Sequence, residues 1–164
     1  LRVRGLTKHY GELQAVRDTL EERVVARTSG LETAAEVSRA IASVLELEEL
    51  LPQVAEVVLE RFGLYYVGVF LLDSTKQWAV LRAGTGQAGR RMLENAHQLQ
   101  VGGASMIGQC TALGEPRIAL DVGDEAYRFD NPLLPETRSE MALPLRWRGE
   151  TMGAMTIQSA VEAA

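Results

Sequence analysis

The 164-residue sequence contains a single cysteine, Cys110, and no long uninterrupted apolar stretch. One cysteine excludes an intramolecular disulfide and any zinc or iron–sulfur site that is built from several thiolates. A helix that crosses a bilayer needs roughly 20 consecutive apolar residues, and a secretory signal needs an apolar core near the N-terminus. Since neither is present, we expect a cytoplasmic segment with no membrane contact of its own, whether or not the parent protein is membrane-anchored.

The sequence has fewer basic than acidic residues. It contains 17 lysine and arginine residues and 22 aspartate and glutamate residues, so its net charge is −5. Proteins that bind nucleic acid present a clustered basic face to the phosphates, so we expect no nucleic-acid partner. The 46% hydrophobic and 24% charged residues are typical of a folded domain. The length fits one domain and an accessory helix. A chain that begins at Leu1 without methionine is expected to be a segment of a longer protein.

Apolar residues near the start of the chain recur with the seven-residue period of a coiled coil. The predicted seam comprises Leu6, Leu13, Leu20, Val24 and Leu31. We therefore expect a helical coiled-coil linker over residues 1–30 that forms a parallel homodimer. Arg17 interrupts the seam, so an amphipathic helix folded against its own domain is the alternative. Whether residues 6–45 form one continuous helix is left open by the pattern.

The rest of the chain predicts an α+β domain. Helical stripes over residues 31–62 end at Gly63, and strand patterns follow at 65–73 and 77–83. Further along we expect a short helix over 90–96, a short strand over 99–101, a helix over 105–112, a short strand over 117–121 and a hairpin of strands 141–147 and 152–158. Adjacent hairpins without βαβ units indicate a central antiparallel sheet of five or six strands, with helices on one face.

Several stretches in a fixed order carry a family resemblance. They are Tyr65 to Asp73, Gly114-Glu115-Pro116 before a short strand, Ser139 to Leu145, and Gly153 to Ser159. Their order and spacing over residues 31–160 resemble the GAF domains of bacterial sensor histidine kinases and related signalling proteins. The preceding residues 20–28 are similar to the linkers that lead into such domains.

The resemblance implies a sheet with a loop-covered pocket on the face opposite the helices. It also implies a non-catalytic sensory module that binds a small ligand or dimerises to control an output such as a histidine kinase, with residues 161–164 leading to that output domain. The matching pocket mixes apolar walls with polar groups, and its candidates are Leu81, Ala83, Ser105, Ile107, Asp121, Tyr127, Phe129 and Leu133. The same residues would equally suit a filled core. No catalytic residue, metal ligand or cofactor is expected.

One glycine-rich motif, Gly84 to Gly89, fits the GxGxxG pattern of dinucleotide sites. Such sites also use an acidic residue about twenty positions later to hold the ribose. Residues 95–114 contain no aspartate or glutamate. We therefore interpret the motif as a flexible loop at the pocket edge.

A cofactor-bearing or catalytic GAF protein, with haem, bilin or cyclic nucleotide, is the alternative function. The attachment cysteine of bilin domains is typically followed by histidine, and the methionine sulfoxide reductases of this family work through several cysteines. Cys110 is not followed by histidine, and it is the one cysteine of the chain. It is therefore expected to be a small, buried apolar residue. If the domain binds haem, His97 is the candidate ligand of the iron. Otherwise we expect a solvated or capping histidine side chain.

Overall fold

The computed structural model describes residues 36–40, 42, 43, 45–123 and 129–161, and it divides the chain into two units, Leu1–Glu46 and Leu47–Ala164. The described residues of the first unit are helical, and Val37 and Leu45 there are half exposed. All five residues of the predicted coiled-coil seam lie outside the described residues, so the linker and its homodimer stay predictions. No helix in the described ranges has the length and apolar character that a bilayer crossing requires.

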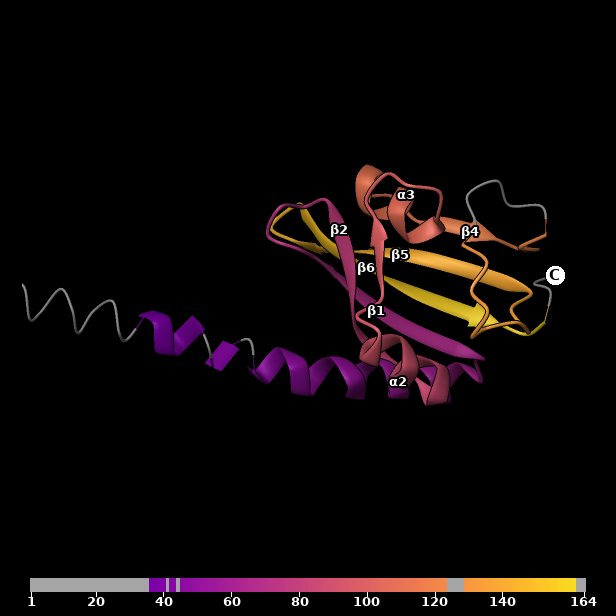
Figure 1. Cartoon of the computed structure of the whole chain (residues 1–164), viewed down its shortest axis with the longest axis horizontal. Coiled ribbons are helices and arrows are strands. Elements are labelled where there is room, and N and C mark those ends of the chain that lie inside the picture. Colours follow the sequence, from indigo (N-terminus) through magenta and orange to yellow (C-terminus); the bar gives the residue numbers. More distant parts are fainter. Residues whose placement is uncertain (1–35, 41, 44, 124–128, 162–164) are drawn as a thin grey trace, which may run out of the picture. The chain divides into compact units, whose positions relative to one another are not determined.

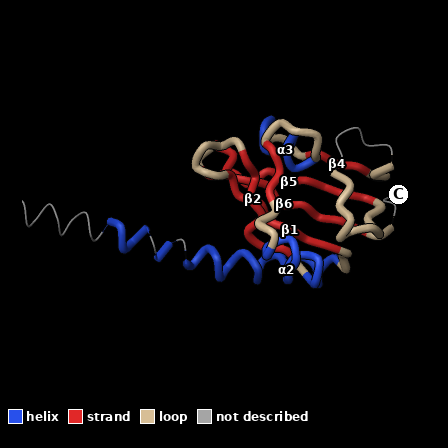
Figure 2. Tube along the Cα trace, in the orientation of Figure 1, coloured by secondary structure: helices blue, strands red, loops and turns tan. Residues whose placement is uncertain are grey.

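The second unit is built on one six-stranded sheet with the order β3-β2-β1-β6-β5-β4 (Figures 1 and 2). Its elements are a helix over residues 47–62, β1 (Tyr66–Leu72), β2 (Trp78–Gly84), α2 (Gly86–Glu94), β3 (Gln98–Gln100), α3 (Met106–Leu113), β4 (Arg117–Ala119), β5 (Ser139–Trp147) and β6 (Glu150–Ser159). Every pair of neighbouring strands is antiparallel. The predicted α+β class and antiparallel sheet are confirmed.

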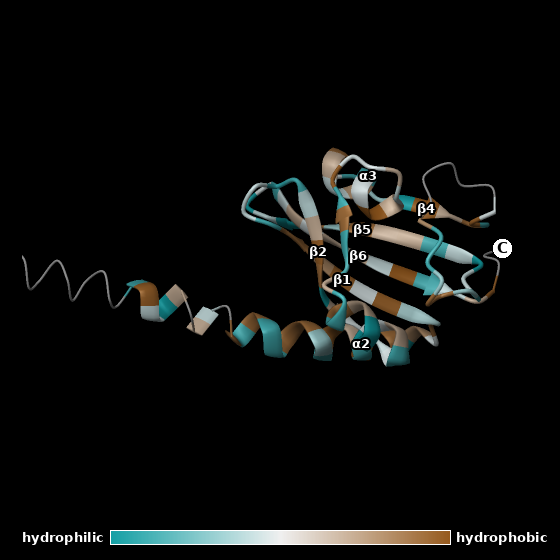
Figure 3. Ribbon diagram, in the orientation of Figure 1, coloured by the Kyte–Doolittle hydropathy of each residue, from teal (hydrophilic) through white to brown (hydrophobic). Residues whose placement is uncertain are grey.

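The two faces of the sheet carry separate apolar clusters. Val67 and Val69 of β1 point to one face, where they pack with Ala55 of the helix over residues 47–62. Tyr66 and Phe70 point to the other face and join the larger cluster, which includes side chains of α2 and α3. This alternation follows from the two-residue period of a strand. Figure 3 shows hydrophilic and hydrophobic residues alternating along the helix, as expected for an element with one face on a sheet.

Local signals explain the elements that were predicted most closely. Ser105 caps α3 by accepting a hydrogen bond from the backbone N–H of Gly108 at 2.9 Å, and Gly114 ends the helix in a left-handed conformation. The β5–β6 hairpin turns through Arg148 and Gly149, whose φ angles are 49° and 85°. Two consecutive positive φ angles define the tight type I′ turn, which matches the twist of the two strands.

The expectation of a flexible loop over Gly84 to Gly89 is wrong. Helix α2 begins at Gly86, four residues before the predicted start, and Thr85 is its N-cap residue. The Thr85 hydroxyl accepts a hydrogen bond from the Val67 N–H at 3.0 Å, and the Thr85 N–H donates to the Val67 carbonyl at 3.0 Å. A Cβ atom on Gly89 would lie 2.1 Å from the carbonyl oxygen of Gly84. These glycines therefore let α2 pack directly on the backbone of β2.

Candidate functional site

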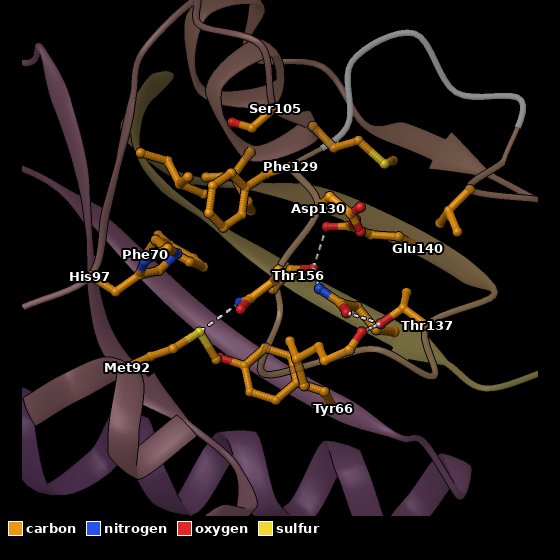
Figure 4. A pocket seen from close by; sticks show the side chains of 17 residues that line it. Tyr66, Phe70, Met92, His97, Ser105, Phe129, Asp130, Thr137, Glu140 and Thr156 are labelled. Carbon is orange, nitrogen blue, oxygen red and sulfur yellow. Dashed lines mark hydrogen bonds between the residues drawn. The ribbon is translucent and has the colours of Figure 1, made fainter. Parts of the chain in front are cut away.

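A cavity lies on the face of the sheet opposite the helix over residues 47–62 (Figure 4). Its floor comes from β1, β5 and β6, and its walls come from α2, the start of α3 and the segment over residues 129–137. The volume of the cavity is about 40 Å³. A volume of this size holds a few water-sized groups, so a larger ligand must displace a side chain of the wall.

A chain of hydrogen bonds crosses the cavity floor. The Thr137 hydroxyl donates to the Gln158 side-chain carbonyl at 2.7 Å, and the Gln158 amide donates to the Thr156 hydroxyl at 3.3 Å. The Thr156 hydroxyl in turn donates to a carboxylate oxygen of Glu140 at 2.8 Å. Thr156 and Gln158 are buried, and buried polar groups that satisfy one another hold a fixed geometry. The network thus anchors the Glu140 side chain at the cavity.

Tyr66 contributes a buried hydroxyl that has no hydrogen-bond partner in the described structure. The side chain is 2% exposed, and its hydroxyl fills the space that two glycines leave open. A Cβ atom on Gly68 or Gly84 would lie 2.7 or 2.8 Å from that hydroxyl oxygen. Burial, and to a smaller extent the charge of Glu140, raise the pKa of Tyr66 well above its ordinary value, so the phenol keeps its proton. The cavity wall therefore contains a neutral donor without an acceptor.

His97 lies between two aromatic rings of the cavity wall. Its ring centroid is 6.0 Å from that of Phe70 and 5.4 Å from that of Phe129. The side chain is half buried, and burial lowers the pKa of His97, so the imidazole is neutral near pH 7. A solvated or capping side chain was expected, and the half-buried ring is partly solvated and also lines the cavity. On the neighbouring wall, the Asn131 amide donates to the Met92 sulfur at 3.0 Å.

Three of the pocket residues proposed from the sequence lie in this cavity wall: Ser105, Ile107 and Phe129. Leu81 is buried in the apolar cluster on the same face, and Leu133 packs against that cluster, but neither lines the cavity. Tyr127 lies outside the described residues.

The other two candidates lie elsewhere. Ala83 belongs to the cluster on the opposite face of the sheet, which rules out a place in the cavity wall. Asp121 lines a separate, open depression together with residues of the segment over 135–138. A β-bulge between β1 and β2 explains the position of Ala83, because the bulge changes the face of the sheet that the Ala83 side chain occupies.

Sequence reasoning missed the residues that give the cavity its polar character. Tyr66, Glu140, Thr156 and Gln158 all line it. One signal was present: Thr156 and Gln158 are polar residues two positions apart in an otherwise apolar strand pattern. Residues with that spacing share one face of a strand, and two buried polar side chains on one face indicate either a hydrogen-bond network or a site.

Cys110 lies in the interior of α3 and is fully buried. It does not line the cavity. Burial raises the pKa of the Cys110 thiol to about 11, although the nearby Arg117 and Arg146 oppose this shift. Since the thiolate is the reactive form, this cysteine is chemically quiet at neutral pH. Within the described ranges, no group of three or more His, Cys, Asp or Glu side chains is placed to share a metal ion.

Comparisons with known proteins agree with this architecture. The sequence model of the GAF domain matches residues 44–164. No curated protein matches the sequence. Among solved structures, the GAF domain of a phosphoenolpyruvate-protein phosphotransferase from Coxiella burnetii has 21% sequence identity and a TM-score of 0.63, covering 79% of this chain and 80% of that one.

Two reductases have the same fold. The type II free methionine-R-sulfoxide reductase from Thermoplasma acidophilum has 19% identity and a TM-score of 0.59, covering 71% of this chain and 77% of that one. The free methionine-R-sulfoxide reductase from Neisseria meningitidis, solved in complex with its substrate, has 26% identity and a TM-score of 0.59. That alignment covers 69% of this chain and 62% of the Neisseria protein.

Proposed function

The chain belongs to the GAF domain family, and from this premise we propose that it is a non-catalytic regulatory module that binds a small molecule in the cavity beside Tyr66. The observation that carries the proposal is the buried Tyr66 hydroxyl without a partner. An unpaired buried hydroxyl costs about 1–3 kcal/mol, a cost that a bound ligand with an acceptor would remove. The ordered polar floor beside it offers further contacts.

The position of Cys110 supports binding without chemistry. Reduction of a sulfoxide by thiols needs a thiolate that attacks the sulfur atom, releases the oxygen as water and ends as a disulfide with a second thiol. This chain has one cysteine, which is buried outside the cavity wall with a pKa of about 11. Even if the cavity accepted free methionine sulfoxide, the substrate class of the Neisseria relative, no thiolate could reach it. The protein would then bind this compound and leave it unchanged.

Regulation requires a route to an output, for which we propose a parallel homodimer through the N-terminal helix and a downstream domain such as a histidine kinase. The seam of Leu6, Leu13 and Leu20 supports this proposal. On the helix over residues 47–62, Leu50 and Val57 are 53% and 63% exposed and lie seven residues apart. Apolar residues with this spacing form a stripe suited to a second, identical helix. A ligand in the cavity, on the opposite face of the sheet, would then affect the dimer by shifting the sheet on which this helix packs.

Native mass spectrometry and a reductase assay test this proposal. We expect protein purified under mild conditions to carry a noncovalent small molecule, or to be stabilised by an added one. With dithiothreitol and free methionine sulfoxide we expect no methionine above the level of a Cys110→Ala variant. Methionine formation that disappears in Cys110→Ala would establish catalysis instead. Protein that retains no compound and is stabilised by no probe would contradict ligand binding.

A further inference from the structure

The sulfur atom of Met92 has a hydrogen-bond donor pointed at it from across the cavity wall. The Asn131 side-chain amide donates to this sulfur at 3.0 Å, and Figure 4 shows the bond as a dashed line. The orientation of the amide is fixed, because the Asn131 carbonyl oxygen accepts from the Leu133 N–H at 3.0 Å. A thioether sulfur is only a weak acceptor. The amide is therefore placed where a stronger acceptor on Met92 would satisfy it better.

The Tyr66 hydroxyl is a second donor near Met92, and it has no partner in the described structure. A Cβ atom on Gly84 would lie 2.8 Å from this hydroxyl oxygen and 2.9 Å from the Cα atom of Gly89, so the hydroxyl lies against the start of α2. Met92 follows Gly89 by three residues and shares its face of the helix. In Figure 4 the Tyr66 side chain points toward Met92. Since burial raises the pKa of Tyr66, the hydroxyl keeps its proton and can donate a hydrogen bond.

The cavity has room for one more oxygen atom on this sulfur. Its volume of about 40 Å³ corresponds to about three water positions. Hydrogen peroxide fits such a space, and the oxygen of a sulfoxide needs about one water position. The Met92 side chain is 3% exposed and lines the cavity, so a small oxidant reaches the sulfur through the cavity.

We infer that Met92 is a site of oxidation by hydrogen peroxide and that Tyr66 and Asn131 hold the resulting sulfoxide. A lone pair of the sulfur attacks one peroxide oxygen, and the S–O bond forms as the O–O bond breaks. The second oxygen leaves with both protons as water, so the sulfur is oxidised by two electrons and the peroxide is reduced. Methionine oxidation ordinarily disrupts a core, because it makes an apolar side chain polar. Here the new oxygen accepts hydrogen bonds from two donors that the thioether leaves poorly satisfied.

Neither the oxidation nor the hydrogen bonds to the sulfoxide require a bound ligand, so this inference goes beyond the proposed function. The two meet at one atom, because the sulfoxide oxygen occupies the Tyr66 hydroxyl that the proposed ligand would use. Oxidised protein should therefore retain less of that ligand than reduced protein.

Met106 is the matched comparison within the chain. It lines the same cavity and is 2% exposed, but no hydrogen bond to its sulfur is found among the described residues. In folded, dialysed protein we expect dilute hydrogen peroxide to oxidise Met92 at least about ten-fold faster than Met106, since ten-fold corresponds to about 1.4 kcal/mol, the size of one or two net hydrogen bonds. Peptide mass spectrometry measures both rates, which should be equal in guanidinium chloride. A Met106 rate equal to or above that of Met92 in the folded protein would overturn the inference.

Two variants each remove one donor. Tyr66→Phe deletes the hydroxyl, and Asn131→Asp deletes the amide N–H groups but keeps an acceptor for the Leu133 N–H. Each should lower the ratio of the Met92 rate to the Met106 rate by about three- to ten-fold. Tyr65→Phe removes a hydroxyl outside the cavity wall and should leave the ratio unchanged. A wild-type ratio in both donor variants would refute the assignment.

The stability of the oxidised protein is a readout that access to the sulfur alone does not change. Met92→Leu keeps an apolar side chain of similar size and cannot form a sulfoxide at this position. Peroxide treatment should lower the melting temperature of the wild type no more than that of Met92→Leu, and it should lower that of Tyr66→Phe further. A larger decrease in the wild type than in Met92→Leu would show that the sulfoxide disrupts the core, which contradicts the inference.

Failure of this inference can be told apart from failure of the proposed function. Native mass spectrometry of unoxidised protein tests ligand binding without any reference to Met92. The rates of Met92 and Met106 in dialysed wild-type protein test the oxidation site without any ligand. Far-UV circular dichroism verifies that each variant is folded, and the comparison of the two methionines in the wild type decides the inference even where a variant does not fold.

Discussion

Gly89 of α2 and Gly84 at the end of β2 are in direct backbone contact, with room for no side chain between them. An alanine within a helix is ordinarily more stable than a glycine by roughly 0.5–1 kcal/mol. Here we expect Gly89→Ala to lower the free energy of unfolding by about 1–3 kcal/mol or more, because the added methyl group overlaps the Gly84 carbonyl. Urea unfolding measures the change. The exposed Gln87→Ala, two residues earlier in the same helix, is the control and should be nearly neutral. A Gly89→Ala protein as stable as the wild type would contradict this contact.

Removal of two different hydroxyls of the cavity should have different effects on the stability of the protein. Tyr66→Phe deletes a hydroxyl without a partner, so the ligand-free protein should be as stable as the wild type or more stable. Thr156→Val deletes a hydroxyl that bonds Glu140 and Gln158, and it should cost about 1–3 kcal/mol. Thermal or urea unfolding of the ligand-free proteins compares the two. Equal destabilisation by both changes would mean that the Tyr66 hydroxyl is satisfied in solution.

Stability should fall as the pH is lowered through the range in which histidine titrates. Burial lowers the pKa of His97 below its value of 6.5 in the unfolded chain. The unfolded state then binds more protons than the folded state between these two pKa values. The contribution is complete above the unfolded pKa and is lost as the pH falls through the folded pKa. We expect the melting temperature to decrease from pH 7.5 to 5.5, and less steeply in His97→Gln.

That pH experiment has a clear negative outcome. If His97→Gln shows the same slope as the wild type, other groups produce the dependence. Asp73 is not expected to contribute in this interval. Its pKa is lowered, first by the hydrogen bond from Thr75, so its stabilising effect is lost only at more acidic pH.

Cys110 should be inert in the folded protein. The thiol is buried, and its pKa of about 11 leaves almost no thiolate at pH 8. We expect Ellman's reagent to react with less than one equivalent of thiol over hours in buffer and with one equivalent at once in guanidinium chloride. Rapid labelling of the native protein would show that α3 opens readily, and it would weaken the argument against thiol chemistry.

The proposed dimer can be tested at the seam of the linker. Leu13→Ala with Leu20→Ala should shift the protein toward monomer in light scattering, since each large-to-small change in a core costs about 2–5 kcal/mol. The circular dichroism of the sheet domain should be unchanged. Glu12→Ala with Glu21→Ala, at polar positions beside the seam, is the matched control. A double leucine variant that stays dimeric would place the interface elsewhere.

The parts of the fold that follow from local signals could be predicted from sequence. The β5–β6 hairpin depends on a turn at Gly149, and α3 depends on its Ser105 cap and its glycine stop. Helix α2 was predicted too short because glycine disfavours helix by roughly 1 kcal/mol per residue. The contact of Gly89 with a strand distant in space overrides that preference, and nothing in the local sequence shows it.

The candidate site was predicted less completely, for a geometric reason. The ladder between β1 and β2 pairs Val69 with Ala83 and Phe70 with Leu81, so Arg82 is an extra residue on β2. A strand without this bulge would place Leu81 and Ala83 on one face. The bulge separates them onto opposite faces, and a two-residue pattern cannot reveal it. The cavity residues of β6 depended in the same way on long-range strand pairing.

Both margins of the sheet are unusually brief, because the outermost strands β3 and β4 have three residues each. An exposed margin offers unpaired backbone groups on which another chain can extend the sheet and aggregate. A strand of three residues offers few backbone groups for such pairing. This holds for β4 although the apolar side chain of Ile118 is 55% exposed. The long apolar strands β1 and β6 each have a neighbouring strand on both sides, so another chain cannot extend the sheet from them. The strand order therefore keeps β1 and β6 away from the margins of the sheet, independently of any ligand.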